Sequence, residues 1–292
     1  MKIVHLLCAA SVASMSLCAG TGLAETAGHA GHVENVSDDV IAAQRAALAA
    51  ATDGAGYGPQ SPRDIDAVKG SNDRAFGTAP DRSVMNLCNI HFHENAEHRG
   101  GDFTTYAGNG DGYGYGTGFR YDGELTEAEL ASFGQPVGVS EHGDLVPGDT
   151  IEIHFVHSTA QVVPGPTLAA CVTEAIGNPQ LRVETVVAVL VNDETAADLT
   201  DIAHIEEVDG YYQVPNLPED LGDAVTYAGS TTGPSYNQAA SPYQVTWSVR
   251  PEVLKLAIGS VASWLENNPF EEDHAHGVRN LVLNLDLLSP IH

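Results

Sequence analysis

Apolar and polar residues alternate along several stretches of this chain, which is the pattern of half-buried β-strands. Residues 150–157, with the sequence TIEIHFVH, alternate with a period of two, and residues 243–249, with the sequence YQVTWSV, do the same. The pattern predicts four strands, at about 84–93, 150–157, 183–191 and 243–249. The chain is therefore expected to be built mainly from β-strands.

Helical periodicity occurs in three stretches, which predicts helices beside the strands. Residues 36–51 are rich in alanine and include Ser37 as a candidate N-cap ahead of two aspartates, so they predict one helix. Residues 125–133 carry a short helical pattern. Residues 252–266 place apolar side chains at helical spacing, which we interpret as a face packed into the core. These side chains are Leu254, Ile258, Val261 and Leu265.

A Gly-rich loop, residues 108–118, lies between the first two predicted strands. Glycine occupies every second position for much of its length, with Tyr113 and Tyr115 in between. This composition predicts a mobile or tightly turned loop. Such a loop either covers a functional site or only decorates the surface, and the sequence leaves both interpretations open.

The N-terminus has the pattern of a secretory signal peptide. Lys2 provides a positive charge, an apolar stretch follows from Ile3, and Gly22-Leu23-Ala24 fits a cleavage site of small residues. Attachment of a lipid would use Cys18, but Leu17 before it is bulkier than such sites usually accept. We therefore expect an exported protein, periplasmic or secreted.

Composition limits the partners and the organisation of the chain. The 292 residues carry a formal net charge of -27, with 12 basic residues against 39 acidic ones, which argues against binding to nucleic acid or to an anionic membrane surface. An apolar share of 43% is enough for a core. We expect a signal peptide at 1–24, an extension with a short helix at 25–55, and one domain at 56–292 with an insertion at about 99–148.

Four cysteines are present, of which Cys8 and Cys18 would leave with the signal peptide. Cys88 and Cys171 would stay in the mature chain, where an oxidising compartment favours a disulfide between them. The alternative is a pair of buried free thiols.

Candidate metal ligands lie on two of the predicted strands. His91 and His93 are two residues apart, so they project from the same face of a strand as a chelating pair. His154 on the second predicted strand supplies a third imidazole, and a catalytic zinc site typically has three protein ligands and one open position. Asn89 and Glu152 each stand two residues before a proposed ligand, where they can hold its second ring nitrogen.

Several motifs together resemble those of carbonic anhydrases. Five blocks occur in the order and context of the α-class motifs: Gln60–Ile65, His91–His93, Glu152–His157, Tyr227–Pro234 and Val245–Trp247. The longer blocks Leu87–His98 and Gly148–Ser158 resemble still more the delta-class enzymes and their bacterial relatives. The resemblance spans roughly residues 56–285.

The resemblance implies a fold and an activity. The fold would be mainly β with peripheral helices around a large, twisted, mostly antiparallel central sheet. The activity would be that of a zinc lyase, the reversible hydration of carbon dioxide to bicarbonate and a proton by a zinc-bound hydroxide. His91, His93 and His154 match the zinc ligands, and Asn89 and Glu152 match the groups that accept their ring N–H bonds.

The resemblance also implies a threonine that orients the hydroxide and a glutamate that accepts from it. Thr232 matches the threonine, with Thr231 as the alternative because the motif departs here from the usual α-class pattern. Two glutamates fit the second role. Glu97 belongs to the delta-type block and is favoured, while Glu141 has the spacing expected before the third ligand.

The remaining site residues implied by the resemblance form the substrate pocket and the proton exit. No residue matches the α-class proton shuttle well; His98 and His142 are candidates, with a surface role as the alternative for each. The apolar wall that receives carbon dioxide is matched by Val156, Val189, Val245 and Trp247.

Two rival functions fit part of the sequence. A cupin-type metalloenzyme would use His91-Phe92-His93 with Glu97, and Pro147-Gly148 before His154, but it leaves the other motifs unexplained. A redox-active metal would favour it. A non-catalytic, exported zinc-binding protein would instead have a closed shell of four ligands.

Overall fold

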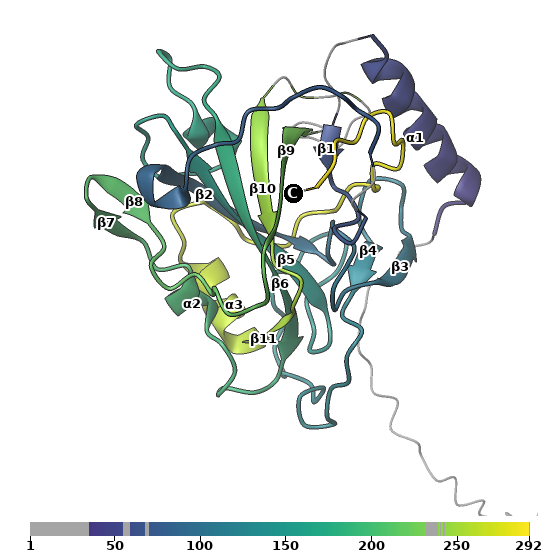
Figure 1. The fold of residues 1–292 in the computed structure, drawn as a ribbon. Coiled ribbons are helices and arrows are strands. Elements are labelled where there is room, and N and C mark those ends of the chain that lie inside the picture. The colour runs from purple at the N-terminus through teal and green to yellow at the C-terminus, as the bar shows by residue number, and fades with distance from the viewer. Residues whose placement is uncertain are drawn as a thin grey trace, which may run out of the picture.

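The computed structural model describes residues 35–54, 59–67, 70–231, 239, 241 and 243–291, so the expected signal peptide lies outside the described part. The described residues form a mostly β structure around one seven-stranded sheet (Figure 1). Its strands run in the order β1-β9-β10-β6-β5-β2, and β11 also pairs with β6. Their bounds are β1 Pro59–Ser61, β2 Asn86–Glu94, β5 Thr150–Ser158, β6 Leu181–Val191, β9 Val225–Thr231, β10 Gln244–Val249 and β11 Leu254–Ala257.

The sheet is mixed, with the longest ladders antiparallel. β5 pairs antiparallel with both β2 and β6, and β10 pairs antiparallel with β9. The shorter ladders β1–β9, β6–β10 and β6–β11 are parallel. The first half of β6 pairs with β10 and its second half with β11, so two short strands follow one another along the same long strand. The expected mainly β fold is confirmed, and its central sheet is mixed.

The four predicted strands are confirmed as β2, β5, β6 and β10, with ends shifted by at most two residues. Strands β1 and β9 were not predicted, because one is very short and the other contains alanine, glycine and serine, which give a weak strand signal. Two small hairpins lie outside the central sheet. They are formed by β3 Thr105–Asn109 with β4 Thr117–Arg120, and by β7 Glu206–Val208 with β8 Tyr211–Gln213.

The helix predictions hold only in part. Helix α1, Asp38–Thr52, confirms the helix of the extension, and α3, Ile258–Glu266, confirms the second half of the helix predicted at 252–266. The first half of that stretch is β11, because its backbone continues the parallel pairing along β6. The helix predicted at 125–133 is wrong: this stretch forms turns, with one helical hydrogen bond from Leu130 N–H to the Thr126 carbonyl at 3.0 Å. The remaining short helices are α2 Leu199–Ile202 and the 3₁₀ turns η1 Arg82–Val84 and η2 Leu168–Cys171.

The central sheet packs on both faces, and β5 shows how the sequence divides them. Ile153 and Phe155 point to one face, where they share a core cluster with Trp264 of α3. His154 and Val156 occupy the alternate positions and point to the opposite face, where Val156 belongs to a second cluster. The polar residues with metal-binding chemistry therefore lie on the face away from α3.

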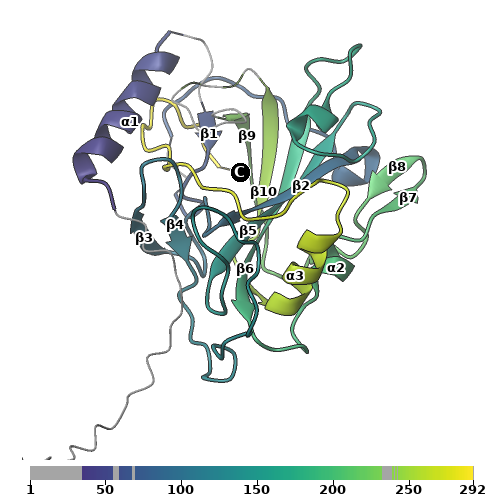
Figure 2. The ribbon, with the colours of Figure 1, turned by 180° about the vertical axis from the view of Figure 1, so that it is seen from behind.

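Helix α1 lies at the edge of the molecule, beside the β3–β4 hairpin and far from α2 and α3 (Figures 1 and 2). Leu48 of α1 packs with Val282 and Leu288 of the C-terminal segment. Among the described residues, every helix is too short or too polar to cross a bilayer.

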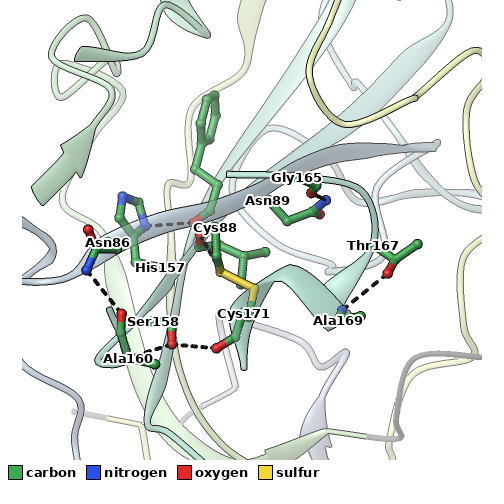
Figure 3. Close-up of a disulfide and its surroundings, with 12 residues drawn as sticks. Asn86, Cys88, Asn89, His157, Ser158, Ala160, Gly165, Thr167, Ala169 and Cys171 are labelled. Carbon is green, nitrogen blue, oxygen red and sulfur yellow. Dashed lines mark hydrogen bonds between the residues drawn. A yellow bond between two sulfur atoms is a disulfide. The ribbon is translucent and has the colours of Figure 1, made fainter. Parts of the chain in front are cut away.

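The predicted disulfide between Cys88 and Cys171 is confirmed (Figure 3). It joins β2, just before the proposed metal ligands, to η2. The same region is held by Asn89, whose side-chain N–H donates to the Gly165 carbonyl at 3.2 Å. Ser158 at the end of β5 donates to the Cys171 carbonyl at 2.7 Å. The segment 165–171 is thus fixed against both strands that carry the histidines.

Candidate metal centre

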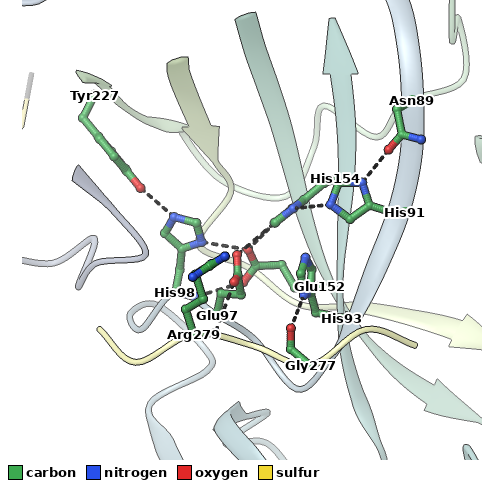
Figure 4. Close-up of polar contacts among 10 residues, drawn as sticks. All are labelled: Asn89, His91, His93, Glu97, His98, Glu152, His154, Tyr227, Gly277 and Arg279. Carbon is green, nitrogen blue, oxygen red and sulfur yellow. Dashed lines mark hydrogen bonds and ion pairs between the residues drawn. The ribbon is translucent and has the colours of Figure 1, made fainter. Parts of the chain in front are cut away.

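Strands β2 and β5 bring three imidazoles together on one face of the sheet (Figure 4). His91 and His93 share a face because they are two residues apart, and His154 lies directly opposite His91 in the antiparallel pair. The ring centroids are 5.2 Å apart for His91 and His93, 5.1 Å for His91 and His154, and 4.8 Å for His93 and His154. One nitrogen of each ring lies within 4.8 Å of the others.

Hydrogen bonds to the outer ring nitrogens fix the tautomer of each imidazole. His91 Nδ1 donates to the Asn89 side-chain oxygen at 2.6 Å, and His93 Nδ1 donates to the Gly277 carbonyl at 2.9 Å. His154 Nε2 donates to Glu152 Oε1 at 2.6 Å. Because these partners are acceptors, the inner nitrogens are left with lone pairs.

The inner nitrogens of His91 and His154 are spaced as two ligands of a tetrahedral metal ion would be. His91 Nε2 and His154 Nδ1 lie 3.3 Å apart, although both carry lone pairs. Two zinc–nitrogen bonds of about 2.0–2.1 Å at a tetrahedral angle separate their nitrogens by about 3.3–3.4 Å. A cation between them turns this repulsive pair into a chelating one.

Electrostatics keep two of the ligands neutral, which is the form that binds metal. Burial, reinforced by the neighbouring histidines, lowers the pKa of His91 well below its usual value. Burial also lowers the pKa of His93 to about 4, against the opposing effect of Glu97. Neutral imidazoles suit zinc and several other transition metals, so the donors define a metal site without selecting the metal.

Glu152 anchors a buried polar chain behind His154. In addition to the bond from His154, its carboxylate accepts from the backbone N–H of His98 at 3.0 Å and from the ring Nδ1 of His98 at 2.7 Å. The Tyr227 hydroxyl lies 2.6 Å from His98 Nε2 and continues the chain. Burial raises the pKa of Glu152, but its interactions with His98 and its hydrogen bond with His154 outweigh this effect and hold the pKa well below its usual value. Glu152 is therefore ionised and complements the charge of a bound cation.

His98 was considered as a proton shuttle or a surface residue, and the structure contradicts both. Its side chain is fully buried between Glu152 and Tyr227. His142, the other candidate, stacks on Tyr115 with ring centroids 3.4 Å apart. It lies behind that ring and does not line the cavity that opens over the three histidines.

The two glutamates considered for the threonine partner lie in different environments. Glu97 is buried, lines the cavity, and places one carboxylate oxygen 4.0 Å from His154 Nε2. Its other oxygen accepts from Arg279 N–H at 3.3 Å. Glu141 has a side chain that is 89% exposed, so the structure brings only Glu97 to the site. Thr232 and the side chain of Thr231 lie outside the described part.

A cavity of about 690 Å³ opens over the three histidines. Val156, Val245 and Trp247 line it as expected, together with Leu181 and Val183 of β6. Val189 does not line it. The register explains this difference: Val183 pairs with Val156, whereas Val189 pairs with Thr150. Six residues along a strand correspond to about 20 Å, which places Val189 at the far end of β6.

Sequence reasoning missed the C-terminal side of the cavity. His276 lines it, with its ring centroid 5.8 Å from that of His91. Its Nε2 lies 2.6 Å from a Glu272 oxygen, and this hydrogen bond raises the pKa of His276. The spacing of four residues between Glu272 and His276 was the one sequence feature that could have indicated this pair. Gly277, which orients His93 through its backbone, has no side-chain signal.

Three imidazoles on a mixed β-sheet, beside a largely apolar cavity, form a site that could hold a metal ion. A family model described as delta carbonic anhydrase matches residues 82–260, which is more than half of the chain, and the protein belongs to this family. Membership implies carbon dioxide hydration and argues against the cupin alternative.

The solved structures similar to this chain include two carbonic anhydrases. An α-carbonic anhydrase of Photobacterium profundum has 18% sequence identity and a TM-score of 0.26, over 79% of this chain and 88% of its own. A hyperthermostable carbonic anhydrase identified from an active hydrothermal vent chimney has 13% identity and a TM-score of 0.28, over 80% of this chain and 86% of its own. No curated protein matches the chain.

Proposed function

We propose that this protein catalyses the reversible hydration of carbon dioxide to bicarbonate with a zinc ion held by His91, His93 and His154. The observation that carries the proposal is the convergence of three imidazole nitrogens at an apolar cavity. When bound, zinc acts as a Lewis acid that makes hydroxide available from water near neutral pH.

The residues around the site divide the remaining work. The wall of Val156, Val183 and Trp247 receives carbon dioxide, which is apolar and needs no hydrogen-bond donor. Glu97, which lines the cavity, is the glutamate that would accept from the hydroxyl of the family's threonine, for which Thr232, with Thr231 as the alternative, is the candidate; that hydroxyl would orient the nucleophile. The charge of Glu152, passed through its hydrogen bond to His154, strengthens that ligand.

Removal of one ligand tests the proposal. His154→Ala is expected to lose zinc and carbon dioxide hydration while the fold is kept, because the other two imidazoles alone make a weak site. Zinc content by elemental analysis and hydration by stopped-flow measure both effects on the purified mature protein. Full activity in the variant contradicts the ligand assignment. Tight zinc binding by the wild type without hydration favours the non-catalytic zinc-binding alternative.

We also propose that the protein is exported after removal of residues 1–24. The disulfide supports this proposal, since such bonds persist mainly in oxidising compartments. N-terminal sequencing of the mature protein from its native host is expected to begin at Glu25. A chain that retains Met1 contradicts the export proposal.

A further inference from the structure

His93 differs from the other two histidines in how it is oriented. The partners of His91 and His154 lie two residues away on their own strands, whereas His93 Nδ1 donates to the carbonyl of Gly277, 184 residues away in the sequence. The orientation of His93 therefore depends on where the segment 276–280 is held. Strand β2 holds one side of this segment, since His276 N–H donates to the Phe92 carbonyl at 2.9 Å.

The Gly-rich loop holds the other side. Val278 N–H donates to the Gly114 carbonyl at 2.8 Å. A Cβ on Gly277 would lie 2.9 Å from the Gly114 carbonyl carbon. A Cβ on Gly114, which has φ +113°, would lie 2.5 Å from the Val278 oxygen. The two backbones touch directly, so any shift of the loop is transmitted to Gly277.

The start of the N-terminal extension ties down the outside of this loop. The Asn35 side-chain oxygen accepts from Gly110 N–H at 2.7 Å, and Val36 N–H donates to the Gly110 carbonyl at 2.8 Å. Asn109 donates to the Val36 carbonyl at 2.9 Å. These bonds pair the extension with the loop much as two strands pair.

Gln44 of α1 joins the loop to the segment behind His93. Its amide N–H donates to the Gly112 carbonyl at 2.8 Å, and its amide oxygen accepts from the Asn280 side chain at 2.6 Å. One side chain therefore spans both elements that meet at Gly277. Leu48, one turn further along α1, anchors the helix on Val282 and Leu288.

We propose that the extension is a positioning element of the metal centre, acting through Asn35, Val36 and Gln44. Its hydrogen bonds hold the Gly-rich loop in contact with Gly277, and this contact fixes the Gly277 carbonyl that orients His93. This inference rests on the function proposed above, because it assigns the extension to the same metal site. Partners that orient metal ligands typically contribute a factor of about 10–100 in metal affinity, and a group acting through such a partner contributes less.

The test uses Gln44→Ala in the full mature chain, with Val40→Ala as the matched control. Both variants introduce alanine into α1, so helix propensity does not fall in either. Val40 is exposed on the same helix. Zinc affinity of the metal-free protein is measured by competition with a chromophoric chelator. The visible spectrum of the cobalt-substituted protein and hydrogen exchange at Val278 N–H are measured alongside.

Gln44→Ala is expected to raise the zinc dissociation constant about three- to tenfold, to alter the cobalt spectrum and to speed exchange at Val278. Asn35→Ala, outside the helix, is expected to act in the same direction and keeps the test valid if Gln44→Ala fails to fold. Zinc affinity and spectra equal to those of Val40→Ala in both variants overturn the inference. Absence of hydration by the wild type refutes the proposed function instead, while the affinity comparison still decides the role of the extension.

Discussion

At the scale of single residues, the orientation of each group in the site depends on the hydrogen bonds that its neighbours make with it. Thr232→Ala is expected to leave zinc bound but to slow hydration about 10²–10³-fold, because the attacking oxygen loses the group that directs it. Stopped-flow hydration and zinc content measure the two effects. Thr231→Ala is the matched control, and a loss confined to that variant moves the assignment by one residue.

Much of this site could be predicted from the sequence, because its placement depends on the period of a strand. The side chains of His91 and His93 must share a face wherever β2 lies, and Asn89 and Glu152 follow from the same rule. Gly277 could not be predicted, since a backbone carbonyl leaves no trace in the sequence and its approach depends on the path of the C-terminal segment. Val189 was misplaced because it was assigned to the wall by the match to the family, whereas its pairing with Thr150 puts it at the far end of β6.

At the scale of elements, the register of β6 determines which valines reach the substrate. Val183→Phe is expected to lower kcat/KM for carbon dioxide about tenfold or more without loss of zinc, because the ring fills the cavity; a tenfold loss corresponds to about 1.4 kcal/mol of transition-state stabilisation. Val189→Ala is expected to cost about 2 kcal/mol of folding stability and to leave kcat/KM unchanged. Stopped-flow kinetics and urea unfolding separate the effects, and the reverse result would contradict the register.

The errors at this scale also have physical causes. Leu254 fits a helical stripe with Ile258 and Val261, but Leu254 and Leu256 also alternate with Lys255 as a strand does. The stretch forms a strand because it pairs with the second half of β6, and a pattern read from the local sequence gives no information about that partner. Residues 125–133 likewise have a helical pattern, but it produces only a single helical hydrogen bond, from Leu130 to Thr126.

At the scale of the whole molecule, this chain carries a formal net charge of -27 and also places some carboxyl groups where burial disfavours their charge. Burial raises the pKa of Asp149 to about 6, and burial together with Asp149 raises the pKa of Glu94. Both line a second cavity, of about 380 Å³, behind Tyr115. An acid with a raised pKa binds its proton more tightly in the folded state, so its ionisation lowers folding stability as pH rises.

Asp149→Asn isolates this contribution, because the amide stays neutral. The stability of the wild type relative to this variant is expected to fall as pH rises from about 4 to about 6, by at most about 3 kcal/mol, and then to level off.

The ionisation of Asp81 has the opposite effect on folding stability. Hydrogen bonds from Ser83 lower its pKa, so Asp81→Asn should be less stable than the wild type above about pH 4 and approach it at lower pH. Urea unfolding of the three proteins from about pH 2.5 to 7.5 measures both trends. A relative stability for Asp149→Asn that does not change across this range would mean that Asp149 ionises freely in the folded protein.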